Sequence, residues 1–408
     1  MSSLKYWVWL SSLSGVGAVT AAALLRQFET PEKIYSAKAA DYIKIDGIRK
    51  PDITVLMDKN METVNKTLAS CSDIGCHILT LQDAQYPDRL RNIYDPPIIL
   101  YVKGYLPIID EEPAVAIVGT RNCTPYGYSA AEKIGYQLAR HGIVVVTGLA
   151  KGVDTAAARG ALRGGGRVVG VIGSGLDIVY PAENRSLFAD VAASGAIISE
   201  YPPGSSALST HFPARNRIIS GISLGVAVIE APKRSGALIT ASRALEQGRD
   251  VFALPGNIDA KNSEGANKLL REGAIPILSG EDIIEEYAEL FPEKIMQDSQ
   301  MHSATQDIKS ADISKEPSWN GEHRLRDNSK KEIDNVSKVD YIDFDEILKT
   351  LAGDDRIVAE AIGRGALSAD NLIINSGLPA AQVMTALTML EINGYATRSG
   401  GLWRLRAP

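Results

Sequence analysis

The residues with the clearest chemical potential are arginines, lysines, glycines and small hydroxyl residues that recur directly after short apolar runs. The run 114–118 ends in Gly119, Thr120 and Arg121. Similar combinations recur in TGLAKGVD (147–154), HFPARNR (211–217) and EAPKRSGA (230–237). Glycines allow backbone N–H groups to approach an anion, and the basic side chains supply charge. The chemistry that these residues favour is therefore phosphate binding rather than bond cleavage.

The apolar runs that precede these residues predict the strands of a sheet. Runs that are apolar throughout are typical of strands buried on both faces of a parallel sheet. We expect strands at 114–119, 143–147, 168–173, 196–200, 225–230 and 250–254, with a weaker one at 275–278. Helices are expected between them at 127–141, 152–164, 184–194, 235–248 and 264–273. This alternation predicts an α/β fold with an extended Rossmann-like, mostly parallel sheet.

The carboxyl ends of parallel strands meet at one edge of a sheet, where ligands bind. The loops at that edge are expected to form a groove for several phosphates, with Phe212 either stacking a base or holding the loop down as a core residue. Glu200 and Glu230 also follow strands. Arg121 can therefore either contact a phosphate or brace one of these carboxylates. The basic residues assigned to the loops are Arg121, Lys151, Arg215, Arg217, Lys233 and Arg234.

Composition indicates an ordinary soluble protein. The 408 residues are 45% hydrophobic and 23% charged, with a net charge of −6, so any nucleic-acid site must be a local basic groove. The three cysteines form no CxxC pair, which argues against a disulfide framework and against structural zinc. The sequence shows neither a signal-peptide pattern nor an apolar run of membrane-spanning length. We expect a cytoplasmic protein with no catalytic residues, metal or cofactor.

Composition also divides the chain into four segments. Residues 1–77 have helical periodicity and residues 78–291 contain the predicted sheet. Residues 292–338 are polar and predict a flexible linker. Residues 339–408 are helical again and end in a strand-like pair.

Several motifs together resemble the DprA/Smf family. They are YPDRLRNIYDPPIILYVKG (86–104), GTR, GLAKGVD, GSGLDIVYPAEN, SEYPPG, FPARNRIISGIS, SGALITAS, GRDVFALPG and EGANKLLREGA, and they cover about residues 80–285 in family order. The resemblance implies a DNA-processing protein of natural transformation that binds and protects single-stranded DNA and helps to load the RecA recombinase. It also implies an extended Rossmann core, a homodimer formed through that core, and no enzymatic activity.

Site residues follow from the resemblance position by position. Arg121 becomes the first candidate for a phosphate contact. The resemblance also assigns to DNA binding Gly119, Thr120, Lys151, Arg215, Arg217, Ser235 and Gly236. Phe212, Asn216 and Lys233 are added because they lie in the same loops. The sequence departs from the family pattern at Ala182 and at Thr210-His211, where many relatives carry basic residues. These departures bear on the affinity for DNA, and Lys233 and Arg234 could compensate for them.

The flanking segments suggest two further helical domains. LSGVGAVTAAALLRQF (13–28) is typical of a helix-hairpin-helix or of a SAM-like bundle used for packing. At the other end, helices at 342–351, 368–375 and 380–393 followed by TRSGGLWRL predict a winged helix. Its last helix carries no lysine or arginine. A protein contact, or weak DNA binding through Arg398, Arg404 and Arg406, is therefore favoured over sequence-specific reading.

Two other functions fit parts of this pattern. Nucleotide phosphoribohydrolases of the lysine-decarboxylase-like group share a glycine-rich first turn. Their PGGxGTxxE motif is absent, and the nearest stretch is PKRSGALITASRALE. A transcription regulator would use the winged helix, but the bare outer face of its last helix argues against that function.

Overall fold

The computed structural model describes residues 3–295 and much of the C-terminal region. The C-terminal residues described are 351, 353–363, 367–368, 372–373, 376, 378–392, 395–399 and 402–405. The chain divides into two compact units, Met1–Lys315 and Glu316–Pro408, each described by itself below. Most of the predicted linker, and the helix predicted at 342–351 up to residue 350, lie outside the described residues.

The first unit is built on a nine-stranded sheet in the order β1-β2-β6-β5-β4-β3-β7-β8-β9. The strands from β6 to β9 in this order run parallel, whereas β2 pairs antiparallel with both β1 and β6. The predicted extended, mostly parallel sheet is therefore confirmed. Its strands are β1 (His77–Thr80), β2 (Ile99–Gly104), β3 (Ala114–Val118), β4 (Val144–Thr147), β5 (Val168–Ile172), β6 (Ala196–Ser199), β7 (Gly225–Val228), β8 (Asp250–Ala253) and β9 (Ile275–Pro276).

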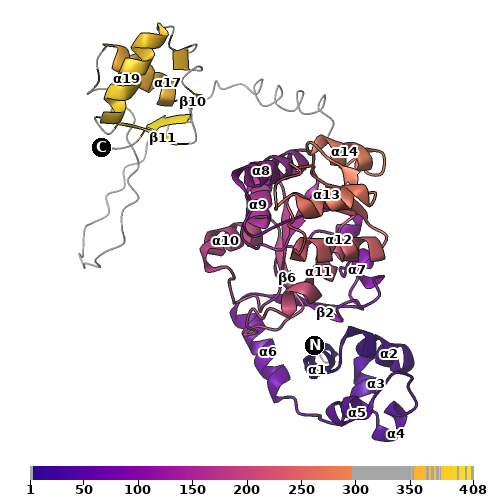
Figure 1. Ribbon diagram of the computed structural model, residues 1–408. Coiled ribbons are helices and arrows are strands. Elements are labelled where there is room, and N and C mark those ends of the chain that lie inside the picture. The colour runs from indigo at the N-terminus through magenta and orange to yellow at the C-terminus, as the bar shows by residue number, and fades with distance from the viewer. Residues whose placement is uncertain are drawn as a thin grey trace, which may run out of the picture. The chain divides into compact units, whose positions relative to one another are not determined.

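Helices cover both faces of the sheet (Figure 1). Alternate residues of β3 belong to two hydrophobic clusters: Val115 and Ile117 to the one that includes α8, α9, α10 and α14, and Ala116 and Val118 to the one that includes α7, α11, α12 and α13. Burial on both faces explains why the central strands read as continuous apolar runs. The helices are α7 (Asp88–Arg91), α8 (Pro125–Arg140), α9 (Val153–Arg163), α10 (Arg185–Ser194), α11 (His211–Ile222), α12 (Gly236–Glu246), α13 (Glu264–Arg271) and α14 (Glu281–Ala288).

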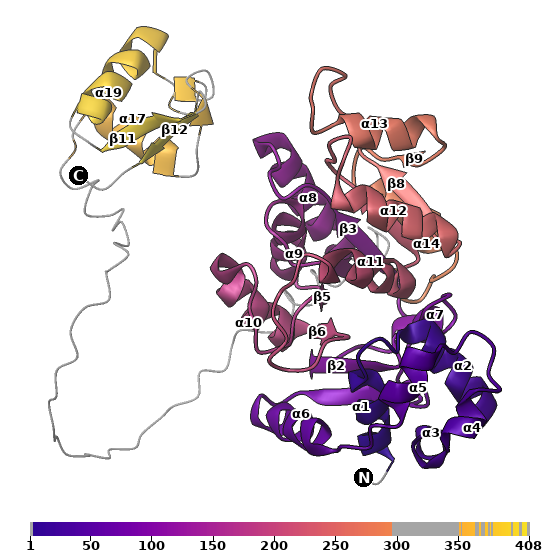
Figure 2. The ribbon, with the colours of Figure 1, turned by 60° about the horizontal axis from the view of Figure 1, so that its bottom comes forward.

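The predicted N-terminal helical segment precedes the sheet (Figure 2). Its α1 and α2 flank the turn 13–17, in which Gly15 has a φ of +89°. Trp9 and Leu10 of α1 belong to the same hydrophobic cluster as Ile99 and Tyr101 of β2, so these helices share a core with the sheet. The helices are α1 (Leu4–Ser12), α2 (Ala18–Phe28), α3 (Pro31–Ser36), α4 (Ala39–Tyr42), α5 (Lys50–Leu56) and α6 (Glu62–Asp73).

Two features of the first unit differ from the sequence prediction. The stretch HFPARNRIISGI, interpreted as a loop, is the helix α11, whose Ile218, Ile219 and Ile222 are buried against the sheet. The strands β1 and β2 were not predicted, although they extend the sheet beyond β6. Within the described part of the chain, no helix combines the length and the apolar character needed to cross a bilayer.

The second unit contains α17 (Gly353–Gly363), α19 (Ala380–Ile392) and a three-stranded sheet in the order β10-β12-β11. The strands are β10 (Leu367–Ser368), β11 (Ala396–Ser399) and β12 (Leu402–Leu405). The predicted last helix and the antiparallel pair of the wing are confirmed. Val383, Leu387, Leu390 and Trp403 form part of the core of this unit.

Candidate functional site

A cavity of about 300 Å³ opens where the order of the strands reverses. The chain passes from β3 through β4 and β5 to β6, and then crosses by α11 to β7 on the other side of β3. Loops that leave β3 and β7 diverge at such a switch point and create a crevice for ligands. The predicted site residues that line the cavity are Gly119, Thr120, Arg121, Phe212, Arg215, Asn216, Ser235 and Gly236.

The turn that follows β3 is fixed on both sides. Thr120 donates its N–H to the carbonyl of Glu230 at 2.7 Å, and its own carbonyl accepts from the N–H of Val153 at 3.3 Å. A Cβ at Gly119 would lie only 2.5 Å from Val153 Cγ2, so this close approach requires glycine. The turn is therefore held rigidly, and it presents the exposed side chain of Arg121 at the cavity.

Arg121 is directed by an aromatic ring rather than by a carboxylate. Its guanidinium carbon lies 4.8 Å from the centroid of the Phe212 ring, a distance suited to a cation–π interaction. Glu230 accepts instead from the N–H and hydroxyl of Thr124 at 2.8 and 2.6 Å. Among the described residues no ion pair forms between Arg121 and either Glu200 or Glu230. The geometry therefore does not show the alternative in which Arg121 braces Glu200 or Glu230.

Arg215 provides a buried positive charge in the wall of the cavity. It is 4% exposed and donates to the carbonyls of Gly148, at 2.9 Å, and Val171. Its Nε has no hydrogen-bond partner in the described part of the chain. Burial lowers the pKa of Arg215 to about 10, although the Asp154 carboxylate acts in the opposite direction. The guanidinium therefore stays charged at neutral pH.

Asp154 is the acidic residue of the same cavity. Burial raises the pKa of its carboxyl to about 6. Arg215 and the N–H groups of Ala150 and Gly148 favour the ionised form and only partly offset this effect of burial. A Cβ at Gly148 would lie 2.5 Å from Arg215 Nη1 and 2.7 Å from Asp154 Oδ2, so this glycine admits both side chains. The charge of the cavity consequently changes as Asp154 titrates.

The N-terminus of α12 completes the wall. Ser235 caps this helix by accepting from the N–H of Ala237 at 3.2 Å, and Asn216 donates to the carbonyl of Gly236 at 3.2 Å. A helix N-terminus carries free N–H groups and a positive partial charge, which favour an anion. Arg234 and Asp154 also line the cavity, although neither was among the assigned site residues.

Three assigned residues do not line this cavity. Lys151 forms an ion pair with Glu183 at 2.6 Å, with both side chains about half exposed. Lys233 is exposed in the loop between β7 and α12. The third is Arg217, which lies elsewhere in the fold.

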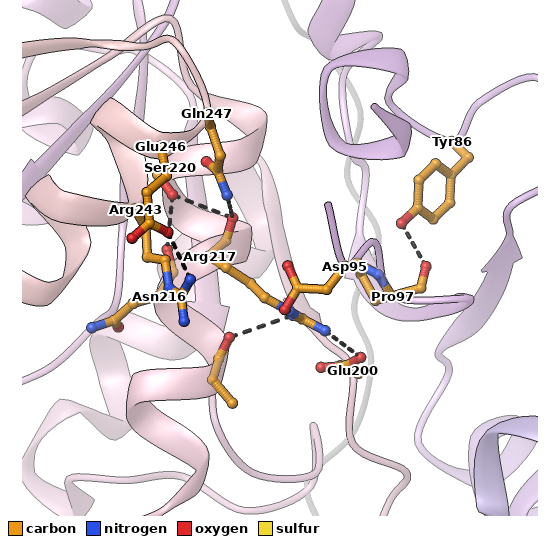
Figure 3. A network of polar contacts seen from close by, with 11 residues as sticks. Tyr86, Asp95, Pro97, Glu200, Asn216, Arg217, Ser220, Arg243, Glu246 and Gln247 are labelled. Atoms are coloured by element: carbon orange, nitrogen blue, oxygen red, sulfur yellow. Dashed lines mark hydrogen bonds and ion pairs between the residues drawn. The ribbon is translucent and has the colours of Figure 1, made fainter. Parts of the chain in front are cut away.

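Arg217 is buried in a separate polar network (Figure 3). Its Nη2 lies 2.7 Å from Glu200 and its Nε 3.1 Å from Asp95. Burial disfavours its charge, but Glu200 and Asp95 outweigh burial and raise the pKa of Arg217. Residues two apart in a helix point about 200° apart, so Arg215 and Arg217 cannot both face the cavity. If the apolar isoleucines of this stretch had been recognised as the buried face of a helix, the sequence would have placed Arg215 and Arg217 on different sides of it.

Comparisons with known proteins identify both units. The family model described as DNA recombination-mediator protein A matches residues 77–288, and the DprA winged helix domain matches residues 345–401. The chain is 43% identical to DNA processing protein DprA of Streptococcus pneumoniae over 60% of this chain and 86% of that protein. It is 39% identical to protein Smf of Synechocystis over 69% of this chain and 72% of that protein.

A solved structure agrees with these matches. The X-ray structure of DprA from Streptococcus pneumoniae superposes with a TM-score of 0.62 and 38% identity, covering 69% of this chain and 97% of that one. The motifs that suggested the resemblance fall within the matched residues 77–288, and the second match includes the predicted last helix and the first strand of the predicted wing. The chain belongs to the DprA/Smf family of DNA-processing and recombination-mediator proteins.

Proposed function

We propose that this protein binds single-stranded DNA without sequence preference, protects it, and helps to load the RecA recombinase on it. It acts in the cytoplasm as a homodimer formed through the Rossmann-like unit, in natural transformation or in general recombination, and it is not an enzyme. The observation that carries the DNA-binding part is the cavity at the switch point. There Arg121, Arg215, Arg234 and the α12 N-terminus converge.

The residues that line the cavity are of the kinds that bind the phosphate backbone of a nucleic acid. Phosphate contacts position a strand without reading its sequence, and they come from arginine side chains, backbone N–H groups and helix N-termini. Arg121 is exposed and can reach a phosphate, whereas the buried Arg215 supplies charge from beneath. Lys151 and Lys233, exposed outside the cavity, are proposed to contact neighbouring phosphates.

A gel shift with oligo-dT and with duplex DNA over a salt series tests this proposal. We expect preferential binding of oligo-dT, with a log–log salt slope of about −0.7 for each phosphate neutralised. Equal or tighter binding of the duplex would refute it.

The phosphoribohydrolase alternative predicts release of free base from purine monophosphates. Help in RecA loading predicts a shorter lag in RecA ATPase activity on DNA coated with single-strand-binding protein.

The ion pair between Lys151 and Glu183 leads to a prediction of stronger binding. Glu183→Gln removes the carboxylate that holds Lys151 at 2.6 Å and leaves its ammonium free for a phosphate. We expect the affinity for oligo-dT to rise about 2- to 5-fold, with a salt slope steeper by up to about 0.7. Glu132→Gln, which removes the partner of Arg163 outside the cavity, is the matched control. Identical effects of the two variants would show that Lys151 makes no specific contact.

The titration of Asp154 leads to a prediction about pH. Its pKa of about 6 means that the carboxyl loses most of its charge between pH 7.5 and 5.5. We expect affinity for oligo-dT to rise about 3- to 10-fold as the pH falls over this interval, because a negative charge leaves the cavity.

The same titration affects the free energy of unfolding. Since the pKa of Asp154 in the folded protein exceeds the ordinary 3.8, the contribution of this group to stability is complete below about pH 4 and is lost as pH rises through 6.

Asp154→Asn separates this effect from histidine titration. The variant should bind more tightly than the wild type at pH 7.5 and should lose the Asp154-dependent part of the pH response. Fluorescence anisotropy with labelled oligo-dT at constant ionic strength measures both quantities. A pH response that is unchanged in the variant would exclude Asp154 as its source.

A further inference from the structure

Helix α6 ends in a Schellman motif that brings two cysteines together. The N–H of Gly75 donates to the carbonyl of Ser72 at 3.2 Å, and the N–H of Cys76 donates to the carbonyl of Cys71 at 2.9 Å. Gly75 has a φ of +64°, the left-handed conformation on which this motif depends. The side chains at the two ends of such a motif frequently contact each other. Cys71 and Cys76 occupy these two positions.

The two thiols share one environment but differ in their access to solvent. Cys71 is 4% exposed and belongs to the hydrophobic cluster that includes Trp9 of α1. Cys76 packs against the same cluster and is partly exposed. Both cysteines are free thiols. A small oxidant in solvent can therefore reach the Cys76 sulfur first.

The neighbours of the pair favour ionisation of Cys76. The Cys71 thiol donates to the Cys76 sulfur, and this contact lowers the pKa of Cys76 and raises that of Cys71. Burial opposes the ionised form of both thiols. In the pairing of β1 with β2, His77 lies opposite Val102, which brings Lys103 close to Cys76. The Lys103 ammonium favours the Cys76 thiolate, whereas Asp177 disfavours it. The thiolate is the reactive form of cysteine, so Cys76 is the nucleophile of the pair.

We propose that Cys76 and Cys71 are a modification site at which hydrogen peroxide forms a reversible disulfide between the end of α6 and the start of β1. The Cys76 thiolate attacks one peroxide oxygen, so that an S–O bond forms, the O–O bond breaks and hydroxide leaves. The Cys71 sulfur then attacks the Cys76 sulfur, so that the S–S bond forms, the S–O bond breaks and a second hydroxide leaves. The two thiol protons convert both hydroxides to water. The thiols lose two electrons and the peroxide gains them.

This site goes beyond the proposed function and does not depend on it. In the sheet, four strands separate β1 from β3, whose carboxyl end carries the DNA cavity. In a reducing compartment a protein disulfide is usually transient and redox-sensing, and a dithiol reductant reopens it by exchange. The third cysteine, Cys123, follows β3 and therefore lies far from the pair.

Mass spectrometry of the full chain after treatment with hydrogen peroxide tests the proposal. The pair lies in one tryptic peptide, residues 67–89, and Cys123 lies in another, residues 122–133. We expect peptide 67–89 to lose two hydrogen atoms and to regain them with dithiothreitol, at a peroxide dose that leaves peptide 122–133 unchanged. Before oxidation, iodoacetamide should modify Cys76 about 5- to 50-fold faster than Cys123, because burial raises the pKa of Cys123.

Four variants assign the roles within the pair. Cys71→Ala removes the second thiol, so Cys76 should pass through sulfenic acid to sulfinic acid and form no disulfide. Cys76→Ala should leave the buried Cys71 unoxidised. Lys103→Gln should slow the alkylation of Cys76 by about 2- to 5-fold. Cys123→Ala is the matched control and should form the disulfide as the wild type does.

Two results would overturn the proposal. One is a peptide 67–89 that gains oxygen in the wild type without forming a disulfide. The other is a disulfide that joins peptides of two different chains. Circular dichroism of each variant checks that it is folded, and the wild-type experiment needs no substitution at all.

Binding of oligo-dT by the reduced and oxidised chains separates this site from the proposed function. The two affinities should agree within about 2-fold, because the pair and the cavity are distant from each other. A larger change on oxidation would refute the independence of the two sites. Failure of the reduced chain to bind would refute the proposed function, whereas the disulfide would still form.

Discussion

Replacement of Arg121 by alanine is expected to lower the affinity for single-stranded DNA about 10- to 100-fold, whatever the base sequence. Arg121 is, with Arg234, an exposed guanidinium of the cavity, and its guanidinium carbon lies 4.8 Å from the centroid of the Phe212 ring. A charge-assisted hydrogen bond to a phosphate contributes about 1.5 to 3 kcal/mol. The salt slope should also fall by about 0.7, because one phosphate is no longer neutralised.

Two variants control for this effect. Arg121→Lys keeps the charge but loses the planar fork, so it should recover the salt slope and only part of the affinity. Arg163→Ala removes a guanidinium that pairs with Glu132 on the helices outside the cavity, and it should change affinity by less than about 2-fold. Equal losses in Arg163→Ala and Arg121→Ala would mean that only overall charge matters and that the cavity is not the site.

Replacement of Arg217 by alanine should instead destabilise the fold. This side chain is 7% exposed, and its loss leaves the carboxylates of Asp95 and Glu200 without their shared partner. Removal of one member of a buried ion pair costs about 3 to 5 kcal/mol. Asp95 and Glu200 are 30% and 24% exposed, and solvent therefore reduces the expected loss to about 2 to 4 kcal/mol. Urea unfolding followed by circular dichroism measures this loss.

The same variant distinguishes a structural arginine from one that contacts DNA. Under conditions where Arg217→Ala stays folded, its affinity for oligo-dT should remain within about 3-fold of wild type. Arg243→Ala, which removes an exposed i,i+3 partner of Glu246, should cost less than about 0.5 kcal/mol. Wild-type stability combined with a large loss of affinity in Arg217→Ala would restore the assignment of Arg217 to the DNA surface.

The sequence predicted the sheet well because burial on both faces leaves a simple signal. Most of the parallel strands read as short Val- and Ile-rich runs, and the observed strands β3 to β9 lie within the predicted ranges. The local sequence also specifies where α8 begins, since Thr124 caps the helix and Pro125 occupies its first position. The sequence placed the site at the carboxyl ends of the parallel strands, whereas the strand order that decides between which strands the cavity opens is known only from the structure.

The errors arise where the local pattern is mixed. The α11 sequence begins with Phe-Pro-Ala-Arg-Asn-Arg, which reads as a loop because proline and polar residues precede its apolar stretch. In the structure Pro213 lies in the first turn of the helix, where a missing N–H costs nothing. The error placed Arg215 and Arg217 on one surface, whereas the helix directs them to opposite sides. Only tertiary contacts reveal the ring contacts of Phe212 with Arg121 and Tyr180.

The turn after β3, which begins Gly119-Thr120-Arg121, lacks the G-x-G-x-x-G pattern of a dinucleotide-binding loop. Such loops use their glycines to bring a pyrophosphate onto the first helix of the fold. Here Thr120 and Arg121 stand in that turn, and Asp154 and Arg215 lie buried behind it. In the proposed function, the turn therefore presents the Arg121 cation to the backbone of the bound strand.

Photocrosslinking of the full-length chain to oligo-dT that carries 5-iodouracil tests the central claim most directly. After digestion, mass spectrometry locates the crosslinked peptides. The peptides expected to carry crosslinks are those that contain Phe212, the turn 119–121 and the start of α12, and Arg121→Ala should reduce all of them together. Crosslinks confined to the N-terminal helices or to residues 353–405, with none in these peptides, would contradict the assignment of the cavity as the DNA site.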